Sequence, residues 1–223
     1  MKKKIIITGG LGYIGTELCK LYSGVSWHHK IIVIDNRFIS ERVNQIRNWN
    51  MDFIQGDILD RDLISRHCKD ADVVHHLAGI TSVPRTKSEV SASQDEKIKE
   101  VGEKGTQNIL NAISDRCKII FPSTHVVYEG IDEVKKDILE DENTKPVLSY
   151  SSSKAVNEEQ LKNSGKNFII LRLGSVYGFS TDSMRIDIMP NLFSKISSQN
   201  GTLKLFAAGR QIKSLVPLID VAR

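Results

Sequence analysis

A glycine-rich turn between the first predicted strand and the first predicted helix constrains this chain more than any other feature. Residues 8–15 read TGGLGYIG and overlap the end of the apolar run 4–8. Gly9 and Gly12 permit a tight turn in which the backbone approaches a ligand, and Gly15 lets the helix pack closely against that turn. Because the free N–H groups of a helix N-terminus attract anions, the turn predicts a pyrophosphate site.

The hydrophobic pattern beyond this turn predicts the fold class. Short β-branched runs alternate with longer amphipathic segments, which is typical of a parallel sheet with helices on both faces. We therefore expect an α/β protein with a Rossmann-type, doubly wound parallel sheet. The expected strands are 4–8, 31–35, 52–55, 73–77, 118–122 and 168–172, and the expected helices begin near Gly12, Ser40, Asp60, Gln94 and Ser149.

A carboxylate at the end of the second predicted strand favours NAD over NADP. Asp35 follows Gly15 by twenty residues, the spacing at which an acidic side chain binds the hydroxyls of the adenosine ribose. Such a carboxylate repels the 2′-phosphate of NADP, whereas Arg37, two residues later, is able to pair with it. We expect NAD as the cofactor.

Small residues end the fourth predicted strand at Leu77, Ala78 and Gly79. They let a cofactor lie against the backbone, although a crowded strand end also uses small residues for packing. The following segment, 79–94, is rich in Ser, Thr and Lys and is expected to be an irregular loop at the ligand-binding edge of the sheet.

Tyr150 and Lys154 are expected to lie one turn apart on the same face of a helix. A phenol with an ordinary pKa of about 10 is a weak base at neutral pH. A neighbouring ammonium and a positively charged nicotinamide favour the phenolate, so Tyr150 is able to remove or return a substrate hydroxyl proton. Lys154 is also expected to hold the nicotinamide ribose.

The third expected catalytic residue is Thr124, which lies where the fifth predicted strand ends. Its hydroxyl is able to point at the same substrate oxygen as the phenol of Tyr150, and Ser123 is the second choice for this role. His125 is expected to support or line the pocket rather than to act as a catalyst.

These segments resemble the extended short-chain dehydrogenases, the NAD-dependent epimerase/dehydratase family that acts on nucleotide sugars. The GxxGxxG spacing of the turn, GTQNIL at 105–110 and RLGSVYG at 172–178 carry the resemblance, which covers essentially the whole chain. It implies NAD-dependent epimerisation of a nucleotide-diphosphate sugar, in which Tyr150 takes a hydroxyl proton while the cofactor takes and returns a hydride. It also implies that Asp57 and Ile58 contact adenine, although Asp57 beside Asp60 fits a helix cap nearly as well.

The resemblance also implies contacts to cofactor and substrate. The expected cofactor contacts are Gly9, Gly12, Tyr13, Ile14, Gly15, Asp35, Asn36, Asp57, Ile58, Leu77, Ala78, Gly79, Tyr150 and Lys154. The expected substrate contacts are Thr124, Ser175 and Lys213.

Three positions depart from the family pattern. Gly102 and Ser175 stand where asparagines are usual, which weakens two expected polar contacts. His125 follows Thr124 where the sugar 4,6-dehydratases have an acidic pair, and this weakens a dehydratase interpretation.

The resemblance predicts two parts of unequal size. Residues 1–173 are expected to form the NAD-binding domain, and 174–223 a small, incomplete sugar-nucleotide-binding portion with a helix over 188–197 and a strand over 203–206. Since family members usually continue beyond the helix predicted to begin at 220–222, we expect residues 1–223 to bind NAD but to turn over a nucleotide sugar poorly.

The composition argues against several other classes of protein. The chain is 40% hydrophobic and 26% charged, its net charge of +4 is scattered, and it lacks the run of about 20 apolar residues that a membrane helix needs. The three cysteines lack the spacing of a zinc site and, being odd in number, of a disulfide framework. We expect buried or half-buried thiols in a cytoplasmic protein that binds no metal, nucleic acid or membrane and is able to form a homodimer.

Two other functions stay open. A reductase, dehydrogenase or dehydratase of a sugar nucleotide shares the same fold, and release of NADH or NADPH would distinguish a reductase from an epimerase that retains its cofactor. The third interpretation is a non-catalytic NAD-binding module, against which the set Thr124, Tyr150 and Lys154 argues.

Overall fold

The structure of the protein is a computed structural model that describes residues 2–81, 91–180 and 183–223. A parallel sheet with the strand order β3-β2-β1-β4-β5-β6 forms its centre. The strands are β1 (Lys4–Thr8), β2 (Lys30–Asp35), β3 (Asp52–Gln55), β4 (Val73–His76), β5 (Lys118–Thr124) and β6 (Asn167–Leu173). The chain moves outward from β1 to β3 and then crosses over to β4, which is the order of a doubly wound Rossmann sheet, so the predicted fold class is confirmed. Most of the expected loop after Gly79 falls on residues 82–90, which lie outside the described residues.

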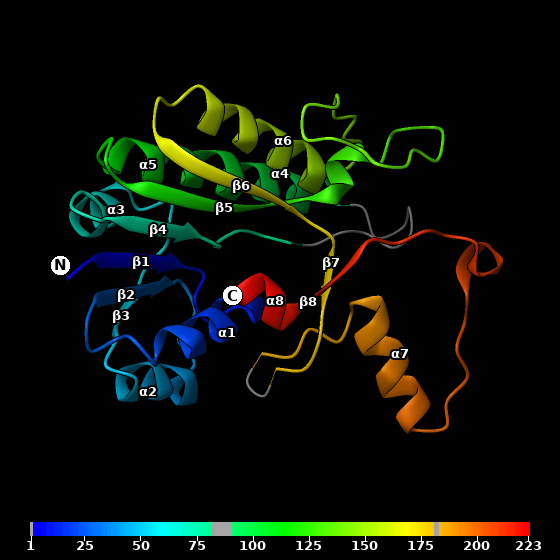
Figure 1. Cartoon of the computed structure of the whole chain (residues 1–223), viewed down its shortest axis with the longest axis horizontal. Helices are drawn as coiled ribbons and strands as arrows, with labels where there is room; N and C mark the ends of the chain where they lie inside the picture. The colour runs from blue at the N-terminus through cyan, green and yellow to red at the C-terminus, as the bar shows by residue number, and fades with distance from the viewer. Residues whose placement is uncertain (1, 82–90, 181–182) are drawn as a thin grey trace.

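Helices cover both faces of this sheet (Figure 1). They are α1 (Tyr13–Tyr22), α2 (Ser40–Asn48), α3 (Arg61–Cys68), α4 (Ala92–Lys99), α5 (Gly105–Ala112) and α6 (Ser149–Lys162). A π-helical turn, η2 (Glu100–Lys104), joins α4 to α5, and a 3₁₀ turn, η3 (His125–Tyr128), follows β5. The helix expected from near Gln94 is therefore two α-helices joined by a wider turn.

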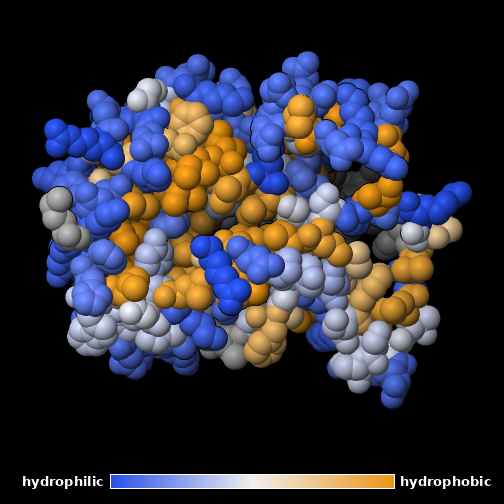
Figure 2. Space-filling model, viewed as in Figure 1, coloured by the Kyte–Doolittle hydropathy of each residue, from blue (hydrophilic) through white to orange (hydrophobic). Residues whose placement is uncertain are grey.

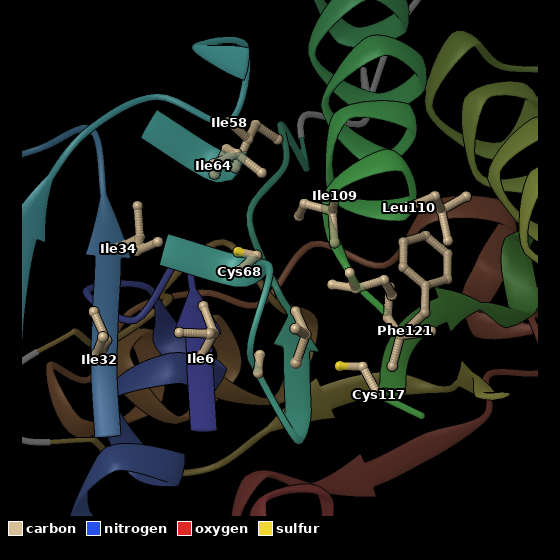
Figure 3. Packing of buried hydrophobic residues seen from close by; sticks show 14 of the residues in the cluster. Ile6, Ile32, Ile34, Ile58, Ile64, Cys68, Ile109, Leu110, Cys117 and Phe121 are labelled. Carbon is tan, nitrogen blue, oxygen red and sulfur yellow. The ribbon is translucent and has the colours of Figure 1, made fainter. Parts of the chain in front are cut away.

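The alternation of side chains along the strands creates two apolar cores, one on each face. Ile6 on β1 and Ile32 on β2 pack with α3 and α5 in the first core, where Ile64, Cys68, Ile109 and Phe121 gather (Figure 3). Their sequence neighbours Ile5 and Ile31 face the second core with α1 and α2. Because both faces are covered, the strands read as continuous apolar runs.

All three cysteines lie in these cores as free, buried thiols, as expected. Burial raises the pKa of Cys19 and Cys68 to about 12 and that of Cys117 to about 11. At neutral pH they are therefore packed apolar groups.

A buried chain of hydrogen bonds fixes the ends of β1 and β4 against α5. The hydroxyl of Thr8 lies 3.0 Å from Nδ1 of His76, and Nε2 of His76 lies 3.1 Å from the hydroxyl of Thr106. The backbone N–H of Ala78 donates to the same Thr8 hydroxyl at 3.2 Å. Burial, aided by the charge of Lys154, lowers the pKa of His76 to about 3, so the ring is a neutral structural link.

The C-terminal portion leaves the sheet after β6 and returns to α1 (Figure 1). Its elements are β7 (Ser175–Tyr177), α7 (Met189–Ser198), the 3₁₀ turn η4 (Phe206–Gly209), β8 (Leu215–Pro217) and α8 (Leu218–Ala222). Strands β7 and β8 pair with each other in a separate two-stranded parallel sheet. The expected helix over 188–197 is confirmed as α7.

The strand expected over 203–206 is wrong. This segment is irregular and runs into η4, and the side chain of Leu205 is 60% exposed. The alternating apolar residues of this segment resemble a strand. However, β7 pairs with β8 and not with residues 203–206. A strand without a partner would leave its backbone N–H and C=O groups unpaired.

One side of the sheet presents apolar side chains to solvent over β6 (Figure 2). Ile169 and Leu171 on this strand are 40% and 37% exposed.

Across the described ranges, every helix is too short or too polar to cross a bilayer.

Gly15 is expected to contribute strongly to the stability of the fold. A β-carbon there would lie 2.4 Å from the carbonyl oxygen of Gly9 and 2.6 Å from Cα of Gly10, both in rigid backbone. We expect Gly15→Ala to lower the free energy of unfolding by about 2 kcal/mol, measured by urea denaturation. Gly24→Ala is the matched control, because its nearest neighbour is 3.7 Å away, and it should change stability by less than about 0.5 kcal/mol. Equal midpoints for the two variants would show that the turn tolerates a side chain.

Candidate active site

A cleft of about 800 Å³ opens at the carboxyl edge of the sheet. Its walls come from the glycine turn, the ends of β2, β4 and β5, the start of α6 and the segments 173–176 and 183–188. The predicted residues that line it are Gly9, Gly12, Tyr13, Ile14, Gly15, Asp35, Asn36, Asp57, Ile58, Leu77, Ala78, Gly79, Thr124, Tyr150, Lys154 and Ser175. The cleft thus joins the glycine turn and the Tyr-Lys pair in one cavity, whose size suits a large organic ligand.

The glycine turn brings the N-terminus of α1 to the cleft. Gly9 adopts a left-handed φ of +70°, and a β-carbon there would lie 2.7 Å from the backbone nitrogen of Ala78. The first turn of α1 contains no acidic residue, and Gly12 at its N-cap makes no side-chain capping bond. The N–H groups at this end are therefore able to bind an anion.

Tyr13 lines the cleft, and its side chain also contacts the C-terminal portion. Its hydroxyl donates to the carbonyl of Gly178 and accepts from Nδ2 of Asn191 at 3.2 Å. Asn191 also accepts from the N–H of Gly178 at 3.0 Å. Tyr13 thus ties the glycine turn to the C-terminal portion, a link that sequence spacing could not predict.

Asp35 lies at one end of the cleft with its carboxylate held by the protein. One oxygen accepts from the N–H of Leu11 at 3.0 Å, and the other accepts from the N–H of Arg37 at 3.0 Å and its Nε at 3.2 Å. The Asp35 side chain is 4% exposed, whereas that of Arg37 is 53% exposed. The guanidinium of Arg37, which could pair with the 2′-phosphate of NADP, is therefore paired with the carboxylate of Asp35.

Asp57 and Asp60 have separate roles. Asp60 caps α3 by accepting from the N–H of Leu63 at 3.0 Å. Asp57 instead accepts from the N–H of Leu59 at 2.9 Å and from Nδ2 of Asn36 at 3.1 Å, and it lines the cleft. The alternative that Asp57 is the helix cap is therefore wrong.

Thr124, Tyr150 and Lys154 meet at the end of β5. The side chains of Thr124 and Tyr150 are hydrogen-bonded to each other. Nζ of Lys154 donates to the carbonyl of Pro122 at 2.8 Å and lies 4.2 Å from the centre of the Phe121 ring. The hydroxyl of Ser123, the second choice for the catalytic hydroxyl, donates to Glu158, which leaves Thr124 as the hydroxyl beside the phenol.

Electrostatics around Tyr150 differ from the expectation. Burial raises the pKa of the Tyr150 phenol, and Arg185 and the bond to Thr124 oppose this shift. The positive charge that acts on the phenol in this structure is thus Arg185, whereas Lys154 is turned to a backbone carbonyl. Arg185 lines the cleft and donates to the hydroxyl and the carbonyl of Thr81 at 3.2 and 3.0 Å.

The start of α6, and with it Tyr150, is held by a carboxylate from the preceding loop. Glu129 accepts from the N–H groups of Val147 at 2.9 Å and Leu148 at 2.7 Å and from the hydroxyl of Ser151. These contacts satisfy donors at the helix N-terminus, which otherwise lacks a side-chain cap.

The predicted substrate contacts do not all reach the cleft. Ser175 lines it and donates through its backbone N–H to the carbonyl of Ser214 at 2.8 Å. Lys213 is exposed and does not line the cleft, although it lies only two residues before Leu215, the register partner of Ser175 on β8. Its role toward a substrate stays a prediction.

The departure at Gly102 is explained by packing. A β-carbon at Gly102 would lie 2.3 Å from the hydroxyl oxygen of Ser153 on α6. The carbonyl of Gly102 accepts from Nδ2 of Asn157 at 3.1 Å, so Gly102 faces α6. Close packing of α6 against this glycine takes the place of the polar contact expected from an asparagine.

His125 fulfils its expectation, since it lines the cleft and its Nδ1 lies 3.0 Å from the carbonyl of Leu173. Several residues that line the cleft come from helices or from the C-terminal portion and could not be predicted from the sequence. They include Arg42, Lys97, Glu100, Val101, Ser183, Arg185 and Ile188. The polar types among them are common on any surface, so only the tertiary fold identifies them.

Comparisons with known proteins agree with this geometry. The chain is 32% identical over 197 residues to dTDP-D-glucose 4,6-dehydratase of Dictyostelium discoideum, covering 79% of this chain and 44% of the relative. It is 29% identical to UDP-N-acetyl-alpha-D-glucosaminuronate decarboxylase of Bacillus cytotoxicus, covering 99% of this chain and 69% of the relative. The chain thus spans about half to two thirds of the length of these curated relatives.

A solved structure shares the fold along nearly the whole chain. The UDP-glucuronic acid 4-epimerase of Bacillus cereus, solved with NAD and a fluorinated UDP-sugar, superposes with a TM-score of 0.82 at 26% identity and covers 98% of this chain and 70% of that one. The model of the NAD-dependent epimerase/dehydratase family matches residues 5–223. This chain therefore belongs to the NAD-dependent epimerase/dehydratase family.

Proposed function

We propose that the protein is an NAD-dependent enzyme that epimerises a nucleotide-diphosphate sugar, with a place in carbohydrate biosynthesis. The observation that carries this proposal is the hydrogen-bonded pair of Thr124 and Tyr150, which lies in the same cleft as the uncapped N-terminus of α1. A group that moves protons and a group that binds a diphosphate therefore share one cavity.

The residues of the cleft fit a dinucleotide. The first turn of α1 would hold the pyrophosphate, Asp35 the adenosine ribose, and Asp57 with Ile58 the adenine. Leu77, Ala78 and Gly79 line the cleft directly after β4, the strand that lies between β1 and β5 in the sheet. Lys154 would hold the nicotinamide ribose, for which it must exchange its bond to the carbonyl of Pro122.

The proposed chemistry divides between the cofactor and the chain. When bound, NAD supplies the acceptor and donor of hydride. Tyr150 removes a proton from the sugar hydroxyl and returns it, while Thr124 donates a hydrogen bond that orients the same oxygen. Arg185 stabilises the phenolate by its charge, which offsets part of the effect of burial. Ser175 also lines the cleft, where it would contact the sugar.

A reductase or a dehydratase is the second candidate. The similarity to a 4,6-dehydratase favours it, but His125 follows Thr124 in place of an acidic residue and is bonded to the carbonyl of Leu173. Elimination needs a group that takes a proton from carbon, and the acidic pair of those dehydratases is missing at this position. Epimerisation needs no such group, so we prefer it.

We also propose a cytoplasmic setting and a homodimer. The three free thiols support a reducing compartment. Measurement of the mass in solution would test the homodimer.

We predict that the chain binds NAD more tightly than NADP. Asp35→Ala removes the carboxylate that would accept the ribose hydroxyls, so it should weaken NAD by about 10- to 100-fold and NADP by less. Titration calorimetry with both cofactors measures this, and Asp52→Ala on the exposed edge of β3 serves as the control. A wild-type chain that prefers NADP would contradict the assignment of Asp35.

We predict that turnover depends on the phenol of Tyr150. Tyr150→Phe should preserve the fold and the affinity for NAD but lower the rate of hydride transfer from a nucleotide sugar by about 10²- to 10⁴-fold. The assay follows NADH absorbance in a single turnover with UDP- and dTDP-sugars. Tyr22→Phe is the control, because it loses a hydroxyl that is hydrogen-bonded to His75 on β4 and does not line the cleft. An unchanged rate in Tyr150→Phe would mean that another group moves the proton.

A further inference from the structure

Lys154 is a half-buried cation whose hydrogen bond goes to a neutral group. Its Nζ donates to the carbonyl of Pro122 at 2.8 Å and lies over the ring of Phe121. Burial lowers the pKa of Lys154 to about 8, and the charge of Glu158 opposes this shift. Lys154 serves the proposed site only in its protonated, ammonium form. The negative charge of Glu158, which favours that form, is therefore important to the site.

Glu158 lies one helical turn beyond Lys154 on α6 and is 2% exposed. Its carboxylate accepts from the hydroxyl of Ser123, and Arg172 donates to it through Nη2 at 2.6 Å and Nε at 3.1 Å. Ser123 and Arg172 are register partners on β5 and β6, so both strands direct a donor at the same carboxylate. Arg172 is fixed in turn by the hydroxyl of Tyr128 and the carbonyl of Glu140.

This network is continuous with the candidate active site. Ser123 lies between Pro122, which accepts from Lys154, and Thr124, which is bonded to Tyr150. The end of β5 is therefore attached to α6 at three successive residues, through Lys154, Glu158 and Tyr150.

We propose that Glu158 is a positioning residue that keeps Lys154 in its charged form and holds the end of β5 against α6. The proposal deepens the proposed function and rests on it for its catalytic meaning. Burial of a carboxylate raises its pKa, but the bonds from Arg172 and Ser123 outweigh this effect and leave the pKa of Glu158 below its ordinary value. Glu158 is therefore an anion at neutral pH, and its negative charge favours the ammonium one turn away.

The other titratable groups around Lys154 do not replace Glu158. His76 on β4 has a pKa of about 3 and is neutral. Tyr150 on α6 has a raised pKa and is also neutral in the protein without ligand. The cation of Arg172 on β6 is paired with Glu158 itself, and Lys162 lies farther along α6 in a pair with Glu159.

The sign of the pH dependence follows directly. Lys154 is charged below its pKa and loses its proton as the pH rises through about 8. Without the negative charge of Glu158 this loss occurs at a lower pH. The charged population at neutral pH then falls, and with it the bond to the nicotinamide ribose that we assign to Lys154.

The test is a direct titration of Lys154 by nuclear magnetic resonance in protein with ¹³C-labelled lysine. Loss of a signal in Lys154→Arg assigns the resonance. We expect Glu158→Gln to lower the Lys154 midpoint by about one pH unit, a tenfold change in its protonation constant. Glu159→Gln is the matched control on the same helix, because its side chain is 62% exposed, and it should leave the midpoint unchanged. A Glu158→Gln protein that is folded and has the wild-type midpoint overturns the proposal.

A second variant guards against unfolding, since Glu158→Gln leaves the half-buried guanidinium of Arg172 without its ion-pair partner. The double variant Glu158→Gln/Arg172→Gln removes both charges, and the Lys154 midpoint should again fall. The titration needs neither NAD nor substrate, so it stays informative if the chain fails to bind NAD, which would contradict the proposed function alone. Conversely, NAD binding with an unshifted midpoint in the folded variants would reject the role of Glu158 alone.

Discussion

The close approach of α1 to the turn after β1 is the constraint on which the rest of the molecule depends. Gly9 lies against the backbone of Ala78, and Gly15 lies against Gly9 and Gly10, at distances that leave no space for a β-carbon. Because of this contact, the N-terminus of α1 opens into the cleft between β1 and β4. The buried chain from Thr8 through His76 to Thr106 holds the same strand ends in place. The anion-binding end of the site is thus built into the backbone before any ligand is bound.

The catalytic end is arranged by charge. Lys154, Glu158 and Arg172 form a series of alternating charges from the cleft to β6, and the charge of Arg185 acts on Tyr150. Each group has an assigned counterpart: Glu158 stabilises the ammonium, Arg172 stabilises Glu158, and Arg185 favours the phenolate of Tyr150. Burial lowers the pKa of Lys154 and raises that of Tyr150, which disfavours the ammonium and the phenolate. The charges of Glu158 and Arg185 oppose these two shifts.

The sheet and the glycine turn could be predicted from the sequence because their signals are local. β-branched runs buried on both faces and glycines between a strand and a helix each have a strong pattern of their own. The strand expected over 203–206 failed because alternation alone does not supply a partner strand. Arg185, and the pairing of Ser123, Glu158 and Arg172, could not be predicted, since they depend on the register of β5 with β6 and on how the C-terminal portion folds back over the cleft. The same tertiary contact explains why the charge beside Tyr150 comes from Arg185 and not from Lys154.

The most direct test of this account is a crystal structure of the chain grown at saturating NAD. The account predicts the pyrophosphate against the first turn of α1, the adenosine ribose on Asp35, and the nicotinamide ring beside Tyr150, with Nζ of Lys154 moved from the carbonyl of Pro122 to the ribose. A cleft without the dinucleotide under these conditions, or a dinucleotide whose nicotinamide lies away from Tyr150, would contradict it.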